Sequence, residues 1–476
     1  MKWKILVAAI GLAASPAQAA EKSGKAVRES QRTLTLDRAV SVALKQNPDI
    51  LKSLQEIKRT RGQVVEIRAQ ALPQLVGTGK YSQSDPELIQ ATTGATALAA
   101  GRSGSFSIQE KSWQITMEVR QLVYSGGQVQ AALKIARLTE DSSYHMLRET
   151  VNQTIATVRS QFFTVLLNRE LITVAEESIQ LLSDQLHDQQ NRFAAGTVPR
   201  FNVLQAEVAL ANARPDLIRA KNNYLIARLQ LAKTLGLGAS SAIDATGSLL
   251  AHPRELNLQK ALAMAKERRA ILKAQNNTIQ TEEQGITVAA AGYKPRLDVD
   301  AGYELKNSRV TNDLAREAHG WYLGVTGTWN IFDGLATKGK VDQAKARLAS
   351  ARVNYADSLH QVELEVQTAF ANVNQAKELL ASQSKVVEQA DEALRLAKER
   401  LAAGAGTQLD VLSAQVARTQ ARTTQKQALS GYHVAIAEFD RATGSETIYE
   451  ETFADPANAR LKPALRGGRT TLRAAD

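Results

Sequence analysis

The sequence predicts an α+β membrane protein built from two tandem structural repeats. Three observations support this fold class: an internal repeat, two unusually long helices with a seven-residue apolar period, and short segments in which apolar and polar residues alternate. The alternating segments supply four strands per chain, whereas about eight strands are the minimum for a transmembrane barrel. Subunits must therefore pool their strands, and a homotrimer would give a 12-stranded transmembrane β-barrel, which we expect to continue into a long α-helical coiled-coil barrel.

The internal repeat has an offset of 208 residues. The stretch RFAAGTVPRFNVLQAEVA begins at Arg192, and RLAAGAGTQLDVLSAQVA begins at Arg400. Between 192–236 and 400–444, 15 of 45 aligned positions are identical without a gap. Self-similarity over this length indicates a tandem duplication.

The two ends of the chain lie outside the repeats. Residues 1–19 are expected to be a signal peptide, because Lys2 and Lys4 precede an apolar run and Ala17-Gln18-Ala19 offers a cleavage site. An uncleaved N-terminal helix is the alternative. Residues 445–476 form a basic tail in a chain of net charge +11. The tail could bind polyanions, but an exported chain seldom meets nucleic acid, so we expect a solvated, disordered tail and no nucleic-acid partner.

Each repeat is predicted to contain a helix, two strands, a very long helix and a return helix. Prolines and glycines are few, at 10 and 28, and the stretches between them are rich in helix-forming residues. The first repeat (20–236) is expected to have a helix over 34–70, strands over 72–82 and 111–124, a long helix over 128–195 and a return helix over 198–235. After a linker (237–255), the second repeat (256–444) is expected to have a helix over 256–292, strands over 295–305 and 321–332, a long helix over 335–403 and a return helix over 407–443.

The two long helices carry an apolar residue at every seventh position. A strict seven-residue period keeps one apolar seam against a partner helix and favours left-handed supercoiling. At 1.5 Å per residue, a helix over 128–195 would be about 100 Å long, which no globular core requires. The heptad residues are Val151, Val158, Val165, Ile172, Ile179, Leu186 and Phe193 in the first repeat, and Leu359, Val366, Val373, Leu380, Val387, Leu394 and Leu401 in the second.

The predicted strands have one apolar and one polar face. In the strand over 111–124, for example, Trp113, Ile115, Met117 and Val119 alternate with polar residues. Strands of about ten residues with an apolar face and aromatic ends are typical of a transmembrane β-barrel. Alternation alone would slightly favour a half-buried soluble hairpin, but the signal peptide and the long helices favour the barrel.

Glycines end both long helices. Gly196 and Gly404 supply the backbone freedom that a helix C-terminus needs, and Thr407 is placed to cap the N-terminus of the second return helix. The chain is therefore expected to form two helical hairpins. Pro215 lies within the first return helix and is expected to kink it.

In combination, these features resemble the TolC-type outer-membrane efflux proteins. The features are the signal peptide, the order of parts in two halves, the Pro-x-Leu strand openings, the VYSGG and IFDG strand ends, and the RxxxG…DVL hairpin tips, and together they cover Leu34 to Gly444. The resemblance implies a homotrimeric channel in the outer membrane of a Gram-negative bacterium, with its barrel in outer-membrane lipid and its helical tunnel in the periplasm. It also implies a periplasmic adaptor (membrane fusion) protein and an inner-membrane RND-type or ABC-type transporter as partners, in type I secretion or drug efflux.

The resemblance also implies a periplasmic entrance at the hairpin tips. In this family, acidic residues form a ring at the entrance, and tyrosine, arginine and aspartate side chains hold the closed state. The two positions that are acidic in the family are occupied here by Asp410 and Ser413. The positions of the closing contacts are Leu401 and Gly406, with Phe201 and Asn202 as their partners on the first tip, so only one carboxylate per subunit remains.

Asp410 has two interpretations. Three Asp410 carboxylates around a trimer axis would favour cations and could bind a hydrated metal ion. Alternatively, Asp410 only stabilises the N-terminus of its own helix. The RxxxG turns resemble the surface on which adaptor tips dock, and two turns per subunit would give a trimer six similar tips. These docking residues are Arg192, Gly196, Arg400 and Gly404.

No motif for catalysis or cofactor binding accompanies these features. The six histidines are scattered, and neither H-E-x-x-H, G-x-S-x-G nor a glycine-rich phosphate loop is present. The chain has no cysteine, which excludes disulfides and thiolate metal sites. We therefore expect no enzymatic activity and no cofactor. The alternative to a channel is an exported coiled-coil stalk or adhesin, which would explain the heptads but not the strand pairs.

Overall fold

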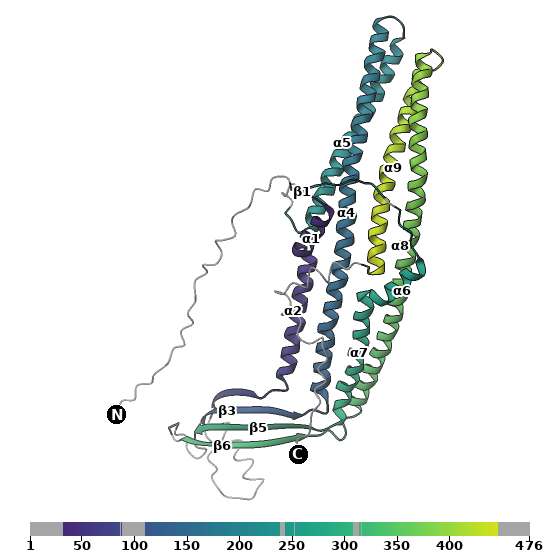
Figure 1. The fold of residues 1–476 in the computed structure, drawn as a ribbon. Coiled ribbons are helices and arrows are strands. Elements are labelled where there is room, and N and C mark those ends of the chain that lie inside the picture. The colour runs from purple at the N-terminus through teal and green to yellow at the C-terminus, as the bar shows by residue number, and fades with distance from the viewer. Residues whose placement is uncertain are drawn as a thin grey trace, which may run out of the picture.

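The computed structural model describes residues 32–85, 87, 110–238, 243–251, 253–307, 314–315 and 317–445. These residues form a long rod of helices with a small β-sheet across one end and two hairpin tips at the other (Figure 1). The signal peptide predicted over 1–19 and the basic tail predicted over 445–476, apart from Ser445, lie outside the described residues. None of the helices in the described ranges is long and apolar enough to cross a membrane.

Two helices of equal length extend through the rod. Helix α4 (Gln128–Ala194) and helix α8 (Ala336–Ala402) have 67 residues each, or about 100 Å at 1.5 Å per residue. Both bounds of α8 lie 208 residues after those of α4, the offset of the sequence repeat. Each long helix is followed by an antiparallel return helix. α5 (Arg200–Thr234) follows α4, and α9 (Gln408–Thr443) follows α8. Pro215 lies inside α5, which continues through it as one helix.

The predictions of a single helix over 34–70 and of a single helix over 256–292 are wrong, because each of these segments forms two helices. The first is divided into α1 (Leu36–Gln46) and α2 (Pro48–Ala69). The second is divided into α6 (Leu258–Arg268) and α7 (Ala270–Ala290), and α7 ends in the short 3-10 helix η1 (Ala291–Tyr293).

Local sequence explains only the first of these breaks. Pro48 disfavours a helical conformation at Asn47, and the side-chain oxygen of Asn47 accepts hydrogen bonds from the backbone N–H groups of Asp49 (2.9 Å) and Ile50 (3.2 Å). At the second break Arg269 has an extended backbone (φ −60°, ψ 118°), although no proline follows it.

At both breaks, a side chain forms a hydrogen bond to the C-terminal end of a return helix. Asn47 donates from Nδ2 to the carbonyl oxygen of Thr234 (2.7 Å), and Arg269 donates from Nη1 to that of Ala442 (3.3 Å). Thr234 and Ala442 occupy equivalent positions of the two repeats, 208 residues apart. The first break therefore has a local cause as well as a distant contact, whereas the break at Arg269 has only the distant contact, which helical periodicity could not predict.

Heptad residues of α4 and α8 form the centre of two buried clusters, one in each repeat. In the first cluster they pack against α1, α2 and the end of α5, and in the second against α6 and the end of α9. Representative members are Val151, Val158, Val165, Leu231 and Ile50 in the first cluster, and Val366, Val373, Ala265, Tyr432 and Phe439 in the second. The heptad pattern thus marks the interior of the rod at its middle, whereas Phe193 near the tip is exposed.

The sheet consists of four antiparallel strands in the order β2-β3-β5-β6. The strands are β2 (Gln74–Gln83), β3 (Lys111–Tyr124), β5 (Arg296–Asn307) and β6 (Glu317–Thr328). The strand predicted over 321–332 is shifted toward the N-terminus, because β5 begins after Pro295 and its first residue, Arg296, already pairs with Thr328. A separate parallel pair, β1 (Arg32–Leu34) and β4 (Ile243–Ala245), was not expected from the sequence.

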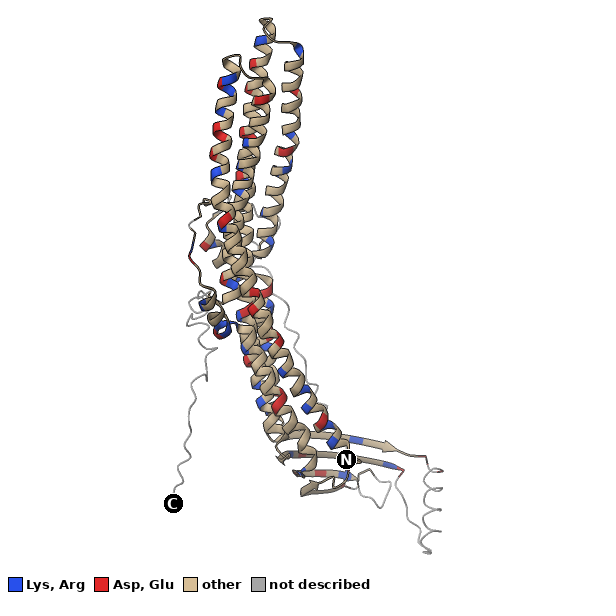
Figure 2. Ribbon diagram, turned by 90° about the vertical axis from the view of Figure 1, so that its right-hand side faces the viewer, with Lys and Arg blue, Asp and Glu red and all other residues tan. Residues whose placement is uncertain are grey.

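The two faces of the four-stranded sheet differ in polarity. One face exposes apolar side chains from all four strands, including Trp321, of which 79% is exposed. The other face carries polar side chains; for example, Tyr322 donates a hydrogen bond from its hydroxyl to Glu118 (2.7 Å). β2 and β6 are the edge strands. In a second view, basic and acidic residues are interspersed along the helices, and the sheet projects from one side of the rod (Figure 2).

Candidate entrance at the hairpin tips

Both hairpin tips begin with the same helix-ending turn. At the first tip, Gly196 has φ 73°, its N–H donates to the carbonyl oxygen of Phe193 (2.9 Å), and the N–H of Thr197 donates to that of Arg192 (2.9 Å). At the second tip, Gly404 also has φ 73° and repeats the pattern. These paired bonds are a Schellman motif, which requires a left-handed residue at this position and so explains the two glycines.

The two tips differ where the return helix begins. α5 begins after Pro199, whereas α9 begins with a capping box at Thr407. Asp410 accepts a hydrogen bond on Oδ2 from the backbone N–H of Thr407 (2.8 Å), and its own N–H donates to the Thr407 hydroxyl (3.2 Å). The prediction that Thr407 caps this helix is confirmed.

The capping box gives Asp410 a definite role within a single chain. The hydrogen bonds from the backbone and side chain of Thr407, together with the charge of Arg400, hold the pKa of Asp410 below its ordinary value. The carboxylate therefore stabilises the N-terminus of α9, which is the simpler of the two interpretations of this residue. Asp410 is exposed, so it also remains available to other copies of the chain.

The remaining predicted entrance residues are distributed over both tips. Phe201 is 69% exposed on α5, and the N–H of Asn202 donates to Pro199 in the first turn of that helix (3.1 Å). Ser413 donates from its hydroxyl to the carbonyl oxygen of Asp410 (3.0 Å). Leu401 is half-buried, and a Cβ on Gly406 would lie 3.1 Å from the backbone nitrogen of Leu401, so the turn passes close to the end of α8.

The predicted docking residues lie at the surface of the tips. Added Cβ atoms on Gly196 and Gly404 would have no neighbour within 4 Å. Arg192 pairs with Asp188 one turn earlier on α4 (2.9 Å), and Arg400 donates to the carbonyl oxygen of Ala405 (3.4 Å). The guanidinium group of Arg400 therefore lies over the turn that follows it, whereas that of Arg192 lies back along α4.

The two hairpins are joined through α4 and α9, which lie side by side in an antiparallel arrangement (Figure 1). We call this contact the α4–α9 seam. Below the tips, the side chain of Lys426 pairs with Glu170 (2.8 Å), and that of Arg422 pairs with Glu177 (2.7 Å). Further from the tips, the ring of His433 stacks on Phe163 with centroids 4.0 Å apart.

Arg422 connects three helices. Besides Glu177 on α4, its guanidinium approaches Asp391 on α8 (3.4 Å), and Asp391 also pairs with Arg418. Burial would raise the pKa of Asp391, but hydrogen bonding to Arg418 and the charge of Arg422 outweigh it and hold the pKa below its ordinary value. Arg422 therefore links the second hairpin to the first, a role that the sequence analysis missed.

Toward the tips the α4–α9 seam changes from ion pairs to buried glutamines. Extending the register of the seam places Gln189 of α4 level with Gln408 of α9, and Leu182 level with Gln415. Gln189 and Gln415 are each 2% exposed, and Gln408 is 6% exposed. Within the described residues, the side-chain oxygen and nitrogen of Gln408 and the side-chain nitrogen of Gln415 have no hydrogen-bond partner.

These unsatisfied amide groups weaken the seam where it is closest to the tips. A buried polar group without a partner costs roughly 1–3 kcal/mol. A pattern in the sequence could have indicated them, since Gln408 and Gln415 are seven residues apart, the spacing at which the long helices carry apolar residues. Among the described residues, no group of three or more His, Asp or Glu side chains could hold a metal ion.

The chain is similar to a protein family in both sequence and fold. Residues 39–237 and 261–445 match the sequence profile of the family described as "Outer membrane efflux protein". Cobalt-zinc-cadmium resistance protein CzcC of Cupriavidus metallidurans is 24% identical over 426 residues, which are 88% of this chain and 91% of that protein. Nodulation protein T of Rhizobium leguminosarum bv. trifolii is 22% identical over 409 residues, covering 85% and 84%. The crystal structure of the Campylobacter jejuni CmeC outer membrane channel superposes with a TM-score of 0.75 at 16% identity, covering 88% of this chain and 89% of that one.

Proposed function

Because the chain belongs to the outer membrane efflux protein family, we propose that it is the channel-tunnel of a tripartite export system. Three copies would enclose one continuous path, with the sheets forming a barrel in the outer membrane and the helices forming a tunnel in the periplasm. Substrates would enter this path at the hairpin tips from an inner-membrane pump and leave through the barrel.

The main support for a trimer is that, within the described residues, the four-stranded sheet is open, with an unpaired strand edge on each side. Its edge strands, β2 and β6, are 10 and 12 residues long, and unpaired edges of this length are unstable in lipid unless another chain pairs with them. Pairing β2 of one copy with β6 of the next would satisfy both edges. Three copies of a four-stranded sheet give a barrel large enough to leave a channel. The apolar face would then contact outer-membrane lipid.

The hairpin tips would form the entrance. In a trimer, Asp410 would contribute three carboxylates around the axis in addition to capping α9, and such a ring favours cations. The usual closing side chains are absent at Leu401, Gly406, Phe201 and Asn202. We therefore assign the closing contacts to the α4–α9 seam, where Arg422 and Lys426 hold the two hairpins together.

The exposed turns at Gly196 and Gly404 would be the surface for a periplasmic adaptor protein. Both turns have the same backbone conformation and lie at the end of the rod. The adaptor would in turn connect the tunnel to an inner-membrane transporter of RND or ABC type. The names of the relatives refer to nodulation in one case and to cobalt, zinc and cadmium resistance in the other, so they do not favour a single substrate class.

Electron microscopy of the detergent-purified protein tests this proposal. We expect three-fold end views and, in side views, a cylinder about 100 Å long extending from the micelle. Planar bilayers containing the same preparation should conduct ions. Compact monomers or thin fibres without conductance would contradict the proposed channel, and thin fibres would favour the alternative of an exported stalk.

A further inference from the structure

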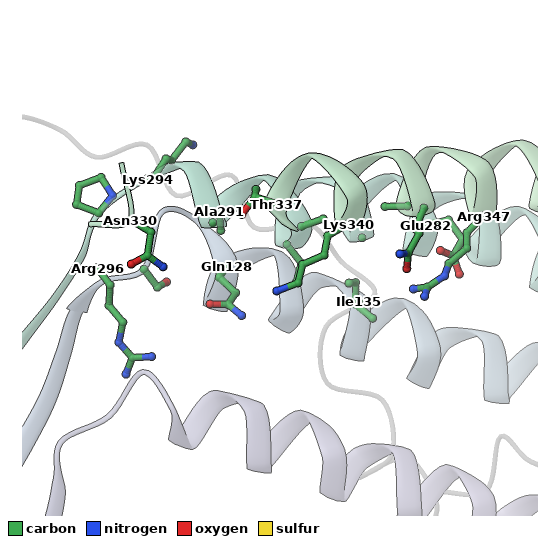
Figure 3. Close-up of a pocket in the computed structure, with 18 of the residues that line it drawn as sticks. Gln128, Ile135, Glu282, Ala291, Lys294, Arg296, Asn330, Thr337, Lys340 and Arg347 are labelled. Atoms are coloured by element: carbon green, nitrogen blue, oxygen red, sulfur yellow. The ribbon is translucent and has the colours of Figure 1, made fainter. Parts of the chain in front are cut away.

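The structure has a cavity of about 720 Å³ where α4, α7 and α8 meet the ends of β5 and β6 (Figure 3). It lies between the part of the molecule that we assign to the membrane and the helical rod. Neither the seam nor the hairpin tips use it. Its wall combines small residues of α7 with long charged side chains from α8 and β5.

Positive charge predominates in this cavity. Arg296, Lys340 and Arg347 all line the cavity, with Arg296 at one end, Arg347 beside Glu282 at the other end and Lys340 between them, whereas Lys294 extends away (Figure 3). Lys340 and Arg347 are seven residues apart on α8 and therefore lie on the same side of that helix. Glu282 is the one carboxylate among the described residues that line the cavity. Arg296 is paired with Asp298. Lys340 and Arg347 share the cavity with the single carboxylate of Glu282, so an excess of positive charge remains that an anion would offset.

The strand register shows which face of the sheet the cavity adjoins. Arg296 pairs with Asp298 two residues along β5 (2.7 Å), on the polar face of the sheet. Leu297 lies between them in the chain and points to the apolar face, where it is exposed. In the proposed barrel the apolar face contacts lipid, so the cavity would open into the interior of the channel.

We propose that this cavity is an anion-binding site in the channel wall, which takes carboxylate or phosphate groups of solutes that pass through. This inference rests on the proposed channel. In a trimer, Arg296, Lys340 and Arg347 of the three copies form a basic ring at the junction of barrel and tunnel. Rings of arginine and lysine select anions in pores, and guanidinium groups bind carboxylates and phosphates in a bidentate manner. The ring lies at the opposite end of the tunnel from Asp410 and has the opposite charge.

The test compares two double variants of the full chain that remove the same charge. Lys340→Gln/Arg347→Gln alters the cavity, and Lys338→Gln/Lys345→Gln alters two exposed residues on the same stretch of α8 that do not line the cavity. Each trimer is inserted into a neutral phosphatidylcholine bilayer, and the reversal potential is measured in a KCl gradient. We expect the cavity variant alone to become less permeable to chloride relative to potassium.

Inorganic tripolyphosphate serves as the probe for binding. We expect it to reduce the conductance of the wild type and of the control variant, and to require about tenfold higher concentration in the cavity variant. Equal shifts in both variants, or in neither, would overturn the anion site. Loss of the block in bilayers that contain anionic phospholipid would assign the cavity to lipid phosphate and overturn the assignment to a solute.

A second readout separates this inference from the proposed channel. Calorimetric titration of the detergent-solubilised protein with tripolyphosphate does not depend on conductance. We expect binding by the wild type and the control variant but not by the cavity variant. Absence of wild-type binding would overturn the site even where the protein conducts, whereas binding without conductance would contradict the channel and support the site.

Discussion

At the scale of single residues, Gly236 lies where the end of α5 meets the break between α1 and α2. Its φ is 74°, and a Cβ at this position would lie 2.1 Å from the carbonyl oxygen of Gln46. We expect Gly236→Ala to lower the free energy of unfolding by about 3 kcal/mol, because left-handed strain of roughly 1–2 kcal/mol and overpacking of roughly 1–3 kcal/mol act together. Denaturant unfolding in detergent measures this loss.

Gly196 offers a matched control for Gly236. Its φ is 73°, but an added Cβ would have no neighbour within 4 Å. Gly196→Ala should therefore show only the backbone strain, a loss of roughly 1–2 kcal/mol. Equal losses for the two variants would contradict the close contact between α5 and the helix break.

Arg269 is a second residue on which the middle of the rod depends. It is 3% exposed, and its guanidinium pairs with Glu149 (3.0 Å) and Glu365 (2.8 Å). Arg269→Met would leave both carboxylates without this partner, and we expect a loss of about 3–5 kcal/mol at neutral pH. Adding Glu149→Gln and Glu365→Gln to this variant should recover much of the loss. A triple variant as unstable as the single one would contradict this assignment.

The pH dependence of the Arg269 contact has a definite sign. Burial would raise the pKa of Glu365, but Arg269 and Arg441 outweigh it and hold the pKa below the ordinary value of 4.5. The stability from Glu365 is therefore complete above pH 4.5 and is lost as the pH falls through the lower, folded-state pKa. We expect the difference in unfolding free energy between wild type and Arg269→Met to decrease below pH 4.5. A constant difference down to pH 2 would contradict the ion pair.

Sequence reasoning succeeded at those residues whose role is set by their immediate neighbours. Gly196, Gly404 and Thr407 were predicted correctly because turns and caps depend on a few adjacent positions. Arg269 and Arg422 were missed because their partners are distant in the chain: Glu365 lies 96 residues from Arg269, and Glu177 lies 245 residues from Arg422. No local pattern identifies which charged residue of a long helix will meet such a partner.

At the scale of elements, the α4–α9 seam is strong at its base and weak near the tips. Replacing Gln408 and Gln415 by leucine would remove the unsatisfied buried amides and should stabilise the contact by roughly 1–3 kcal/mol for each site. In bilayers, we expect this double variant to conduct less than the wild type and Arg422→Gln to conduct more. Gln190→Leu, at an exposed position of α4, is the control and should leave the conductance unchanged.

The stacked pair of His433 and Phe163 makes the same seam sensitive to pH. Burial lowers the pKa of His433, although a hydrogen bond to Leu250 partly opposes this. The folded protein therefore favours the neutral ring. Stability is complete above the unfolded pKa of about 6.5 and decreases as the pH falls from there to the lower, folded-state pKa.

His433→Phe should make this decrease smaller, which thermal unfolding between pH 7.5 and 5 would measure. The remainder comes from His145, whose pKa is also lowered by burial. His187→Phe, at an exposed position of α4, should retain the full decrease. A wild type whose melting temperature does not change over this range would contradict the burial of a neutral imidazole.

The elements themselves were largely predictable because their periods are long. Heptads recurring from Val151 to Phe193 and from Leu359 to Leu401, in stretches without proline, predicted α4 and α8, whose ends were placed to within one residue. Alternation predicted the strands of the sheet, although it is weaker in the glycine-rich β2. The exact limits of β6 were not predictable, since they follow from where β5 begins. The β1–β4 pair was missed because strands of three residues are too short to show a period.

At the scale of the whole molecule, the apolar face of the sheet should decide whether the protein enters a membrane. We expect Leu323→Lys, which alters an exposed residue on this face of β6, to weaken insertion into vesicles by about 2–4 kcal/mol. Thr326→Lys, on the polar face of the same strand, is the matched control and should cost little. The fraction of folded, vesicle-inserted protein recovered at increasing urea measures both effects. Equal losses would contradict the assignment of the faces.

The strand order has a consequence for how the molecule forms. β3 pairs with β2 in its own repeat but also with β5 in the other, so that Val119 lies opposite Ala301, 182 residues later in the chain. The first hairpin of strands must therefore wait, with one edge of β3 unpaired, until the chain has been synthesised and exported as far as β5 in the second repeat. Contacts this distant in sequence form slowly. The sheet is thus slow to assemble, and a nascent chain depends on protection of that edge until β5 has been exported.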